Sequence, residues 1–244
     1  MKLTDAHCHL ANLNELMPLE PLLEEAKQKG IIRFLSSVLS KSEIAYHIQH
    51  PHPEILVSAG IHPNFEDCDL ELADISALCE ENQIWAVGEI GLDRGNPDLD
   101  WQKGVLAAQL DLAAEYKLPV VLHIIGFQQQ AYEILKNYPL RYLVHSYAGS
   151  LEGYRLLARL DSFFTISERI LRPDKLTLLR EIVASGAYLF ETDITRYYVK
   201  DNEPNPLLRL VGLFCLTAEV LKLEKAELER GQSASLAKLL GGRA

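Results

Sequence analysis

The sequence predicts an α/β protein, a (β/α)8 barrel that carries extra helices at its C-terminal end. Eight short apolar runs with the character of β-strands alternate with segments of helical spacing, and this alternation is typical of a parallel sheet. Eight such units are enough to close the sheet into a barrel, and the length of 244 residues is usual for one barrel. We therefore expect residues 1–244 to form a single domain.

The first four strand and helix units follow one another from the N-terminus. Their strands are expected at residues 3–9, 31–38, 55–62 and 84–92. Spacings of three and four place side chains on one side of a helix. The first helix therefore has an apolar face made of Leu19, Leu22, Leu23 and Ala26. Gly30, just after it, is a typical helix stop.

The other four strands are expected at residues 119–125, 141–147, 163–167 and 187–194. Runs such as PVVLHII are continuously apolar, as in strands that are covered on both faces. The polar segment 195–206 contains prolines and tyrosines, and we expect it to form a long loop over the mouth of the barrel. Segments 206–221 and 225–240 predict the extra helices.

Composition limits the class of protein. The net charge of −10 argues against a broad basic surface for duplex nucleic acid, although metal ions at a site can still meet a phosphate. The four cysteines form no CxxC pair and indicate reduced thiols. The N-terminus enters a strand without a signal peptide, and no apolar stretch is long enough to span a membrane. We therefore expect a cytoplasmic protein.

Imidazoles and carboxylates stand at or near the ends of five of the strand-like runs. They are His7, His9, Glu89, His123, His145 and Asp193. In a barrel of parallel strands these ends converge on one face, where active sites form. Four imidazoles and two carboxylates can bind one or two divalent metal ions. The chain is therefore predicted to be a metal-dependent hydrolase.

Each of these residues also has a structural interpretation. His7 and His9 share one face of a strand with Asp5, and an isolated HxH pair is as often hydrogen-bonded in a core as bound to a metal. Glu89 lies in an apolar strand, where a buried salt bridge is the alternative to a metal. Asp193 could instead cap a helix or a turn. The coincidence of all six at strand ends favours the metal site.

Six motifs occur in a fixed order along the chain, namely DAHCHL, GIHP, VGEIGLD, LHI, VHSYAGS and ETD. Together they resemble the TatD family of metal-dependent deoxyribonucleases, which belongs to the amidohydrolase-like TIM barrels. The resemblance covers about residues 3–206. It implies metal ligands at His7, His9, Glu89, His123, His145 and Asp193.

The resemblance also implies roles for these residues. Asp193 completes the shell of the metal bound by the HxH pair and serves as the general base, and Glu89 bridges the two metals. His62, in GIHP, corresponds to a family histidine beside the site that contacts substrate. Asp93 corresponds to a supporting position. Gln102 and Gln109 follow at spacings that the family also uses.

The activity implied by the resemblance is hydrolysis of phosphodiester bonds in DNA, from the 3′ end of single strands or at DNA ends. Two divalent ions, Mg, Mn or Zn, are the implied cofactors. No membrane is involved, and protein partners in a multi-component system are an open possibility. Tyr197 and Tyr198, with Phe127 and Tyr147, are candidates for stacking on bases at the mouth, and ordinary packing is the alternative.

The chain departs from the family pattern at positions close to the substrate. Ile125 stands where the family usually has an arginine, Thr195 where proline is common, and Tyr147 where phenylalanine is usual. A replacement cation is expected from Arg94, Arg172 or Arg196. These departures keep two alternatives open. One is an amidohydrolase-type enzyme for another ester, amide or small phosphoester, and the other is a catalytically decayed metal-binding subunit of a defence or repair complex.

A second group of histidines, His47, His50 and His52, is interrupted by prolines. We interpret it as a surface loop between a helix and a strand rather than as a metal site.

Overall fold

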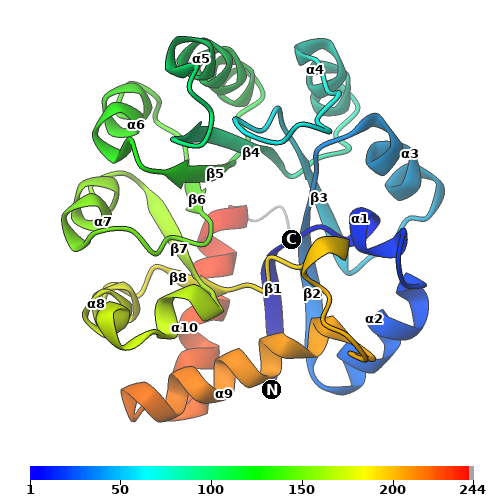
Figure 1. Ribbon diagram of the computed structural model, residues 1–244, viewed down its shortest axis with the longest axis vertical. Helices are drawn as coiled ribbons and strands as arrows, with labels where there is room; N and C mark the ends of the chain where they lie inside the picture. The colour runs from blue at the N-terminus through cyan, green and yellow to red at the C-terminus, as the bar shows by residue number, and fades with distance from the viewer. Residues whose placement is uncertain (242–244) are drawn as a thin grey trace.

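Eight parallel strands close into a barrel in the computed structural model, which describes residues 1–241 (Figure 1). The strands follow chain order around the barrel, and β8 pairs with β1 through Phe190 and Asp5. Their bounds are β1 Leu3–Cys8, β2 Ile31–Val38, β3 Ile55–Ala59, β4 Ala86–Asp93, β5 Val120–Ile125, β6 Tyr142–Val144, β7 Ser162–Ile166 and β8 Tyr188–Phe190. The predicted (β/α)8 barrel is confirmed, and the last three residues of the predicted domain lie outside the described residues.

Eight helices lie around the outside of the strands (Figure 1). Those that follow the strands bury an apolar face against them, as Leu106, Leu110 and Ala113 do in α5. The side chain of Asp98 caps α5 by accepting a hydrogen bond from the backbone of Trp101. The bounds are α1 Leu10–Asn14, α2 Leu19–Gln28, α3 Lys41–Gln49, α4 Leu72–Glu80, α5 Leu99–Glu115, α6 Gln128–Leu135, α7 Leu151–Leu157 and α8 Leu176–Ser185.

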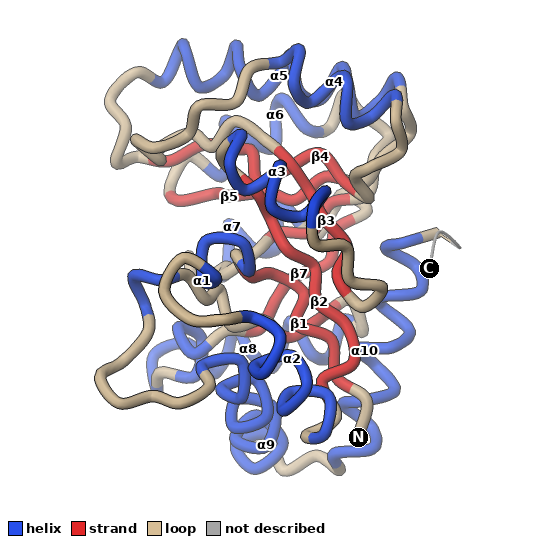
Figure 2. The backbone as a smooth tube through the Cα atoms, turned by 90° about the vertical axis from the view of Figure 1, so that its right-hand side faces the viewer, coloured by secondary structure: helices blue, strands red, loops and turns tan. Residues whose placement is uncertain are grey.

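The two extra helices are α9 Arg209–Leu221 and α10 Lys225–Leu240. Helix α10 packs across the starts of β1 and β8, where Glu229 accepts a hydrogen bond from the Lys2 backbone at 2.9 Å (Figure 2). Leu239 and Leu240 complete a buried cluster with residues of seven strands, Ala6, Leu35, Ala86, Val121, Leu143, Phe163 and Leu189. One end of the barrel is thereby sealed, and the carboxyl ends of the strands face the loops at the other end.

Three strands end three or four residues earlier than the sequence suggested. Strands β3, β6 and β8 end at Ala59, Val144 and Phe190. The chain leaves the extended conformation soon after β6 and β8, at Ser146 with φ 47° and at Asp193 with φ 53°. His62, His145 and Asp193 therefore lie on the loops that directly follow the strands.

The expectation of a surface loop was wrong for His47. This residue lies in α3, is only 9% exposed, and has its Nε2 3.4 Å from the hydroxyl of Ser36. His50 follows the helix and is exposed, as expected. Among residues 1–241, none of the helices combines the length and hydropathy that a membrane crossing requires.

Candidate metal centre

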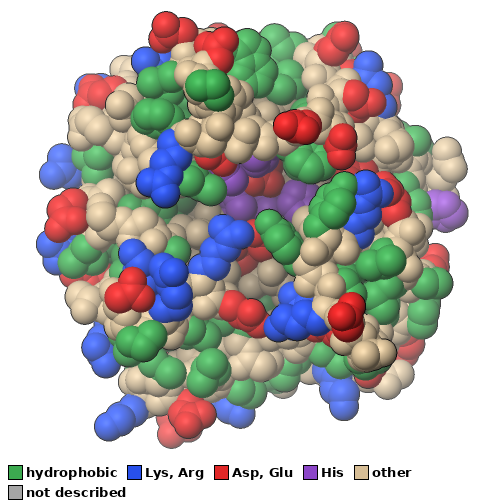
Figure 3. All heavy atoms as spheres, in the orientation of Figure 1, with side chains coloured by type: hydrophobic (Ala, Val, Ile, Leu, Met, Phe, Trp, Pro, Cys, Tyr) green, Lys and Arg blue, Asp and Glu red, His purple; other side chains and the backbone are tan. Residues whose placement is uncertain are grey.

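The predicted site residues meet at the carboxyl ends of the strands. Five of the six predicted ligands line a cavity of about 420 Å³, together with His62 and Asp93. His7 is fully buried directly beside it. Figure 3 shows histidine side chains at the bottom of a hollow in the centre of this face, with Lys and Arg side chains near its edge.

Glu89 is the centre of the cluster. It lies in β4, is 3% exposed, and directs its two oxygens toward different imidazoles. Its Oε2 is 3.3 Å from Nε2 of His7 and 3.5 Å from Nε2 of His9. Its Oε1 is 2.9 Å from Nδ1 of His123 and 2.6 Å from Nε2 of His145. One carboxylate thus faces two separate pairs of nitrogen atoms.

Gly91 allows β4 and β5 to approach closely at this point. A Cβ atom at Gly91 would lie 1.8 Å from the carbonyl oxygen of His123. Only glycine leaves room for this contact. The second glycine of the GEIGLD motif therefore helps to bring Glu89 within reach of His123.

The HxH histidines are oriented by β2. Nδ1 of His9 donates to the carbonyl oxygen of Ser37 at 3.1 Å, and Nδ1 of His7 lies 3.4 Å from the Ser37 hydroxyl. When Nδ1 carries the proton, Nε2 has a free lone pair. Both Nε2 atoms point toward Asp193, at 3.7 Å for His7 and 3.9 Å for His9.

Asp93 orients His123. Its Oδ2 accepts a hydrogen bond from Nε2 of His123 at 2.7 Å, and its Oδ1 accepts one from the backbone of Gly95 at 2.7 Å. In the neutral ring, which is the form that binds a metal, this arrangement leaves the Nδ1 lone pair of His123 facing Glu89 and, at 3.0 Å, Nε2 of His145. A carboxylate that holds the far nitrogen of an imidazole is common beside metal ions.

His62 directs its protonated nitrogen toward the cluster, whereas the protonated Nε2 of His123 faces away from it, toward Asp93. Its Nδ1 accepts a hydrogen bond from the backbone N–H of Asn64 at 2.9 Å, so Nε2 carries the proton of the neutral ring. That Nε2 lies 3.3 Å from Oε1 of Glu89. A protonated nitrogen donates hydrogen bonds and cannot bind a metal. The geometry therefore suits His62 to a hydrogen-bond donor in the cavity.

Burial and neighbouring charges shift the pKa values of the cluster in different directions. Burial raises the pKa of Glu89, but the nearby imidazoles, His145 first, outweigh it and hold that pKa well below its usual range. Burial lowers the pKa of His7 and His123, yet the carboxylates beside them raise both to about 9. Burial dominates at His9 and His145, whose pKa values fall to about 4 and about 3.

The donor atoms fit divalent metal ions. Nε2 of His7 is buried without a hydrogen-bond partner. Ligand atoms lie within 4.8 Å of one another in two groups, His7 with His9 and Glu89, and His7 with His145 and Asp193. A third group at this spacing, His62 with Glu89 and His123, includes the protonated ring of His62. Imidazole and carboxylate ligands in this number suit Zn or Mn, and the carboxylates also admit Mg.

The two glutamines that the resemblance pointed to, Gln102 and Gln109, support the loops of the site. Gln102 is buried and bonds the backbone of Asp93 through both ends of its amide, at 2.7 and 3.0 Å. Gln109 does the same for Ile61, at 2.6 and 3.2 Å. They therefore fix the segments that carry Asp93 and His62.

The sequence analysis missed two charged residues. Glu191, in the ETD motif, is fully buried, and burial raises its pKa to about 8. Arg169, which follows β7, has its Nη2 4.0 Å from Oδ2 of Asp193. The signal for Arg169 was its position after a strand-like run. None of the three cations predicted instead, Arg94, Arg172 and Arg196, lines the cavity, and two of them have other partners, Asp174 for Arg172 and Glu15 for Arg196.

The chain is similar to known proteins in sequence and in fold. A family model described as TatD related DNase matches residues 4–234. The chain is 25% identical over 229 residues to the uncharacterized metal-dependent hydrolase YjjV of Escherichia coli K12, covering 86% of this chain and 88% of YjjV. It is 28% identical over 200 residues to the 3′-5′ ssDNA/RNA exonuclease TatD of Erwinia tasmaniensis, covering 77% of each. The crystal structure of YjjV shares the fold, with a TM-score of 0.82, 24% identity and 97% of each chain covered.

Proposed function

Because this chain belongs to the family of TatD-related DNases and is a metal-dependent hydrolase, we propose that it removes nucleotides from the 3′ end of single-stranded nucleic acid. Two relatives carry the name 3′-5′ ssDNA/RNA exonuclease. The closed barrel, whose first and last strands pair, supports the prediction that residues 1–244 act as one domain.

The position of Glu89 carries the proposal. Its two oxygens face two pairs of imidazoles, as expected for a carboxylate shared by two metal positions. We assign one position to His7, His9 and Asp193, and the other to His123 and His145. Divalent ions bound there would polarise a phosphoryl oxygen and lower the pKa of water.

Asp193 is proposed as the general base. Its carboxylate is 17% exposed and lines the cavity, so it can reach a water molecule beside a bound phosphate. Burial raises its pKa above the ordinary value for aspartate, which makes the carboxylate a better proton acceptor. His62 would donate a hydrogen bond from its Nε2–H to a phosphate oxygen and hold the substrate in place.

A second candidate is hydrolysis of another ester, an amide or a small phosphoester. One observation favours it. Ile125, which replaces the usual arginine, lines the cavity and removes a charge that could meet a phosphate. An apolar wall at this point suits an uncharged substrate better than a polynucleotide.

The test is shortening of single-stranded oligonucleotides labelled at the 3′ or the 5′ end, with Mg, Mn or Zn added. We expect metal-dependent loss of nucleotides from the 3′ end. Asp193→Asn should lower the rate by about 10²- to 10⁴-fold, the usual contribution of a general base. Asp174→Asn, at an exposed carboxylate outside the cavity, is the control. Intact oligonucleotides in the presence of bound metal would favour the second candidate.

A further inference from the structure

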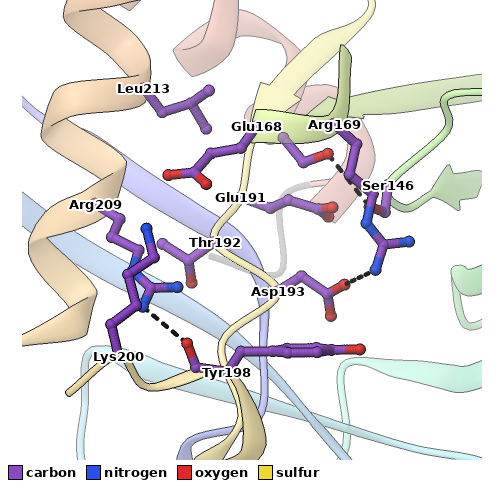
Figure 4. Close-up of a pocket in the computed structure, with 11 residues that line it drawn as sticks. Ser146, Glu168, Arg169, Glu191, Thr192, Asp193, Tyr198, Lys200, Arg209 and Leu213 are labelled. Carbon is purple, nitrogen blue, oxygen red and sulfur yellow. Dashed lines mark hydrogen bonds and ion pairs between the residues drawn. The ribbon is translucent and has the colours of Figure 1, made fainter. Parts of the chain in front are cut away.

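A second cavity of about 260 Å³ lies directly beside the metal cavity. The two cavities share four lining residues, Ser146, Arg169, Asp193 and Tyr198. Figure 4 shows the guanidinium group of Arg169 and the carboxylate of Asp193 pointing toward one another at this boundary, with the Tyr198 ring extending alongside them. A molecule bound at the metals can therefore extend past Asp193 into the second cavity.

Three cations, Arg169, Lys200 and Arg209, line this cavity together with three acidic residues, Glu168, Glu191 and Asp193. Arg169 comes from the segment after β7 and is half exposed, and its nearest carboxylate is Asp193 at the long distance of 4.0 Å. Lys200 comes from the loop after β8. Within residues 1–241, no carboxylate lies within 4.0 Å of the Lys200 ammonium group. Arg169 and Lys200 are thus available to an anionic ligand.

The loop that carries Lys200 is held in place by an internal ion pair. Arg209 binds Glu203 and donates to the carbonyl oxygen of Tyr198 at 2.8 Å. Glu203 also accepts a hydrogen bond from the Lys200 backbone at 3.0 Å. The charge of Arg209 is therefore already neutralised, whereas the conformation of the loop keeps Lys200 at the cavity.

Tyr198 offers an aromatic surface between the two cavities. Its side chain is 52% exposed although it lines both. The neighbouring Tyr197 is instead in contact with Arg196, whose guanidinium carbon lies 4.7 Å from the ring centre. Exposed aromatic rings beside cations are typical of surfaces that bind single-stranded nucleic acid.

We propose that the second cavity is a subsite for the phosphate next to the scissile phosphodiester of a nucleic-acid strand, bound by Arg169 and Lys200, with the adjoining base against Tyr198. This inference rests on the proposed function, which places the scissile phosphate at the metals. It locates the phosphate-binding charge on the β7 and β8 side of the barrel, whereas Ile125, at the end of β5, provides no charge. The enzyme should therefore prefer polynucleotides over substrates with a single phosphodiester.

The experiment compares two substrates in the metal-loaded protein. One is single-stranded decathymidylate, and the other is thymidine 5′-(p-nitrophenyl phosphate), which has no neighbouring phosphate. The measured ratio is kcat/KM for decathymidylate divided by kcat/KM for the thymidine ester. We expect Lys200→Gln to lower this ratio about tenfold, as for loss of one charge-assisted hydrogen bond. Arg169→Gln should lower the ratio similarly. Lys200 is the more decisive position because Arg169 also contacts Asp193.

The matched control is Arg172→Gln. Arg172 lies three residues after Arg169, is exposed, and lines neither cavity. Its substitution removes the same charge and should leave the ratio unchanged. A ratio in Lys200→Gln equal to that of the Arg172→Gln control would overturn the subsite.

A binding measurement separates this inference from the proposed function. Fluorescence anisotropy of 5′-fluorescein-labelled decathymidylate is recorded in EDTA over a range of salt concentrations. One lost phosphate contact should reduce the slope of log K against log[salt] by about 0.7. If the parent protein cleaves neither substrate, the proposed function fails. The salt dependence of decathymidylate binding then tests by itself whether the subsite exists. A smaller slope in Lys200→Gln supports it, and an equal slope or no binding by the parent protein refutes it.

Discussion

Asp5 in β1 and Thr192 just after β8 form two hydrogen bonds across 187 positions of sequence. The backbone N–H of Thr192 donates to Oδ1 of Asp5 at 2.9 Å, and its hydroxyl donates to Oδ2 at 2.6 Å. Asp5 is fully buried, and burial raises its pKa to about 7. The pair joins the first strand to the last and fixes the backbone immediately before Asp193.

Thr192→Val should destabilise the protein. The substitution keeps the shape of the side chain but leaves Oδ2 of Asp5 buried without a donor, which costs about 1–3 kcal/mol. We expect the free energy of unfolding, measured by urea titration, to fall by that amount. Thr177→Val, at an exposed position in α8, should change it by less than about 0.5 kcal/mol. Equal effects of the two substitutions would show that the pair contributes nothing.

Asp93→Asn should weaken metal binding without removing a ligand. If the new amide oxygen keeps the hydrogen bond from Gly95, its NH₂ group faces Nε2 of His123. His123 must then accept at Nε2 and carry its proton on Nδ1, the atom that faces Glu89. Loss of such an orienting carboxylate usually lowers metal affinity about 10- to 100-fold. Calorimetric titration with Zn or Mn measures the change.

The control for this prediction is Asp100→Asn, because the carboxylate of Asp100 is fully exposed on α5. It should retain the affinity of the parent protein. If Asp93→Asn also retains that affinity, Asp93 does not determine which nitrogen of His123 is free.

His123→Ala and His62→Ala should have different effects on metal content. Nδ1 of His123 is free to bind a metal, whereas Nε2 of His62 carries a proton. Elemental analysis after loading should show less metal per chain in His123→Ala and an unchanged amount in His62→Ala. Both variants should hydrolyse substrate more slowly. A loss of metal in His62→Ala alone would reverse the two assignments.

His47 should make stability depend on pH. Burial lowers its pKa from 6.5 in the unfolded chain to about 4 in the folded protein. The unfolded chain therefore binds the proton first, and the free energy of unfolding decreases as pH falls from 6.5 toward 4. The contribution of this single group can reach about 3 kcal/mol at the acid end.

Urea titrations at several pH values test this prediction. In His47→Gln the decrease attributable to this residue should disappear, so the difference from the parent protein should vary with pH. His50→Gln, at the exposed histidine after α3, should keep the pH dependence of the parent. A parallel pH profile in His47→Gln would exclude His47 as the source.

The sequence by itself was enough to predict the barrel and the gathering of the site residues. Strand-like runs alternate with helical spacing over the whole chain, and parallel strands of a barrel all end on the same face. Polar residues such as His7, Glu89 and His123, placed at those ends, must therefore lie close together. The strand and helix pattern and the position of each residue within it were enough for that conclusion.

Only the tertiary structure decided which atoms of these residues are free and which cations are near them. The proton positions of His62 and His123 depend on Asn64 and Asp93, whose approach is set by loop conformation. Arg169 faces the cavity, whereas the predicted Arg196 is paired with a distant residue, Glu15. Sequence spacing determines where a strand ends, but the direction of a long side chain on a loop depends on contacts made by residues far apart in the chain.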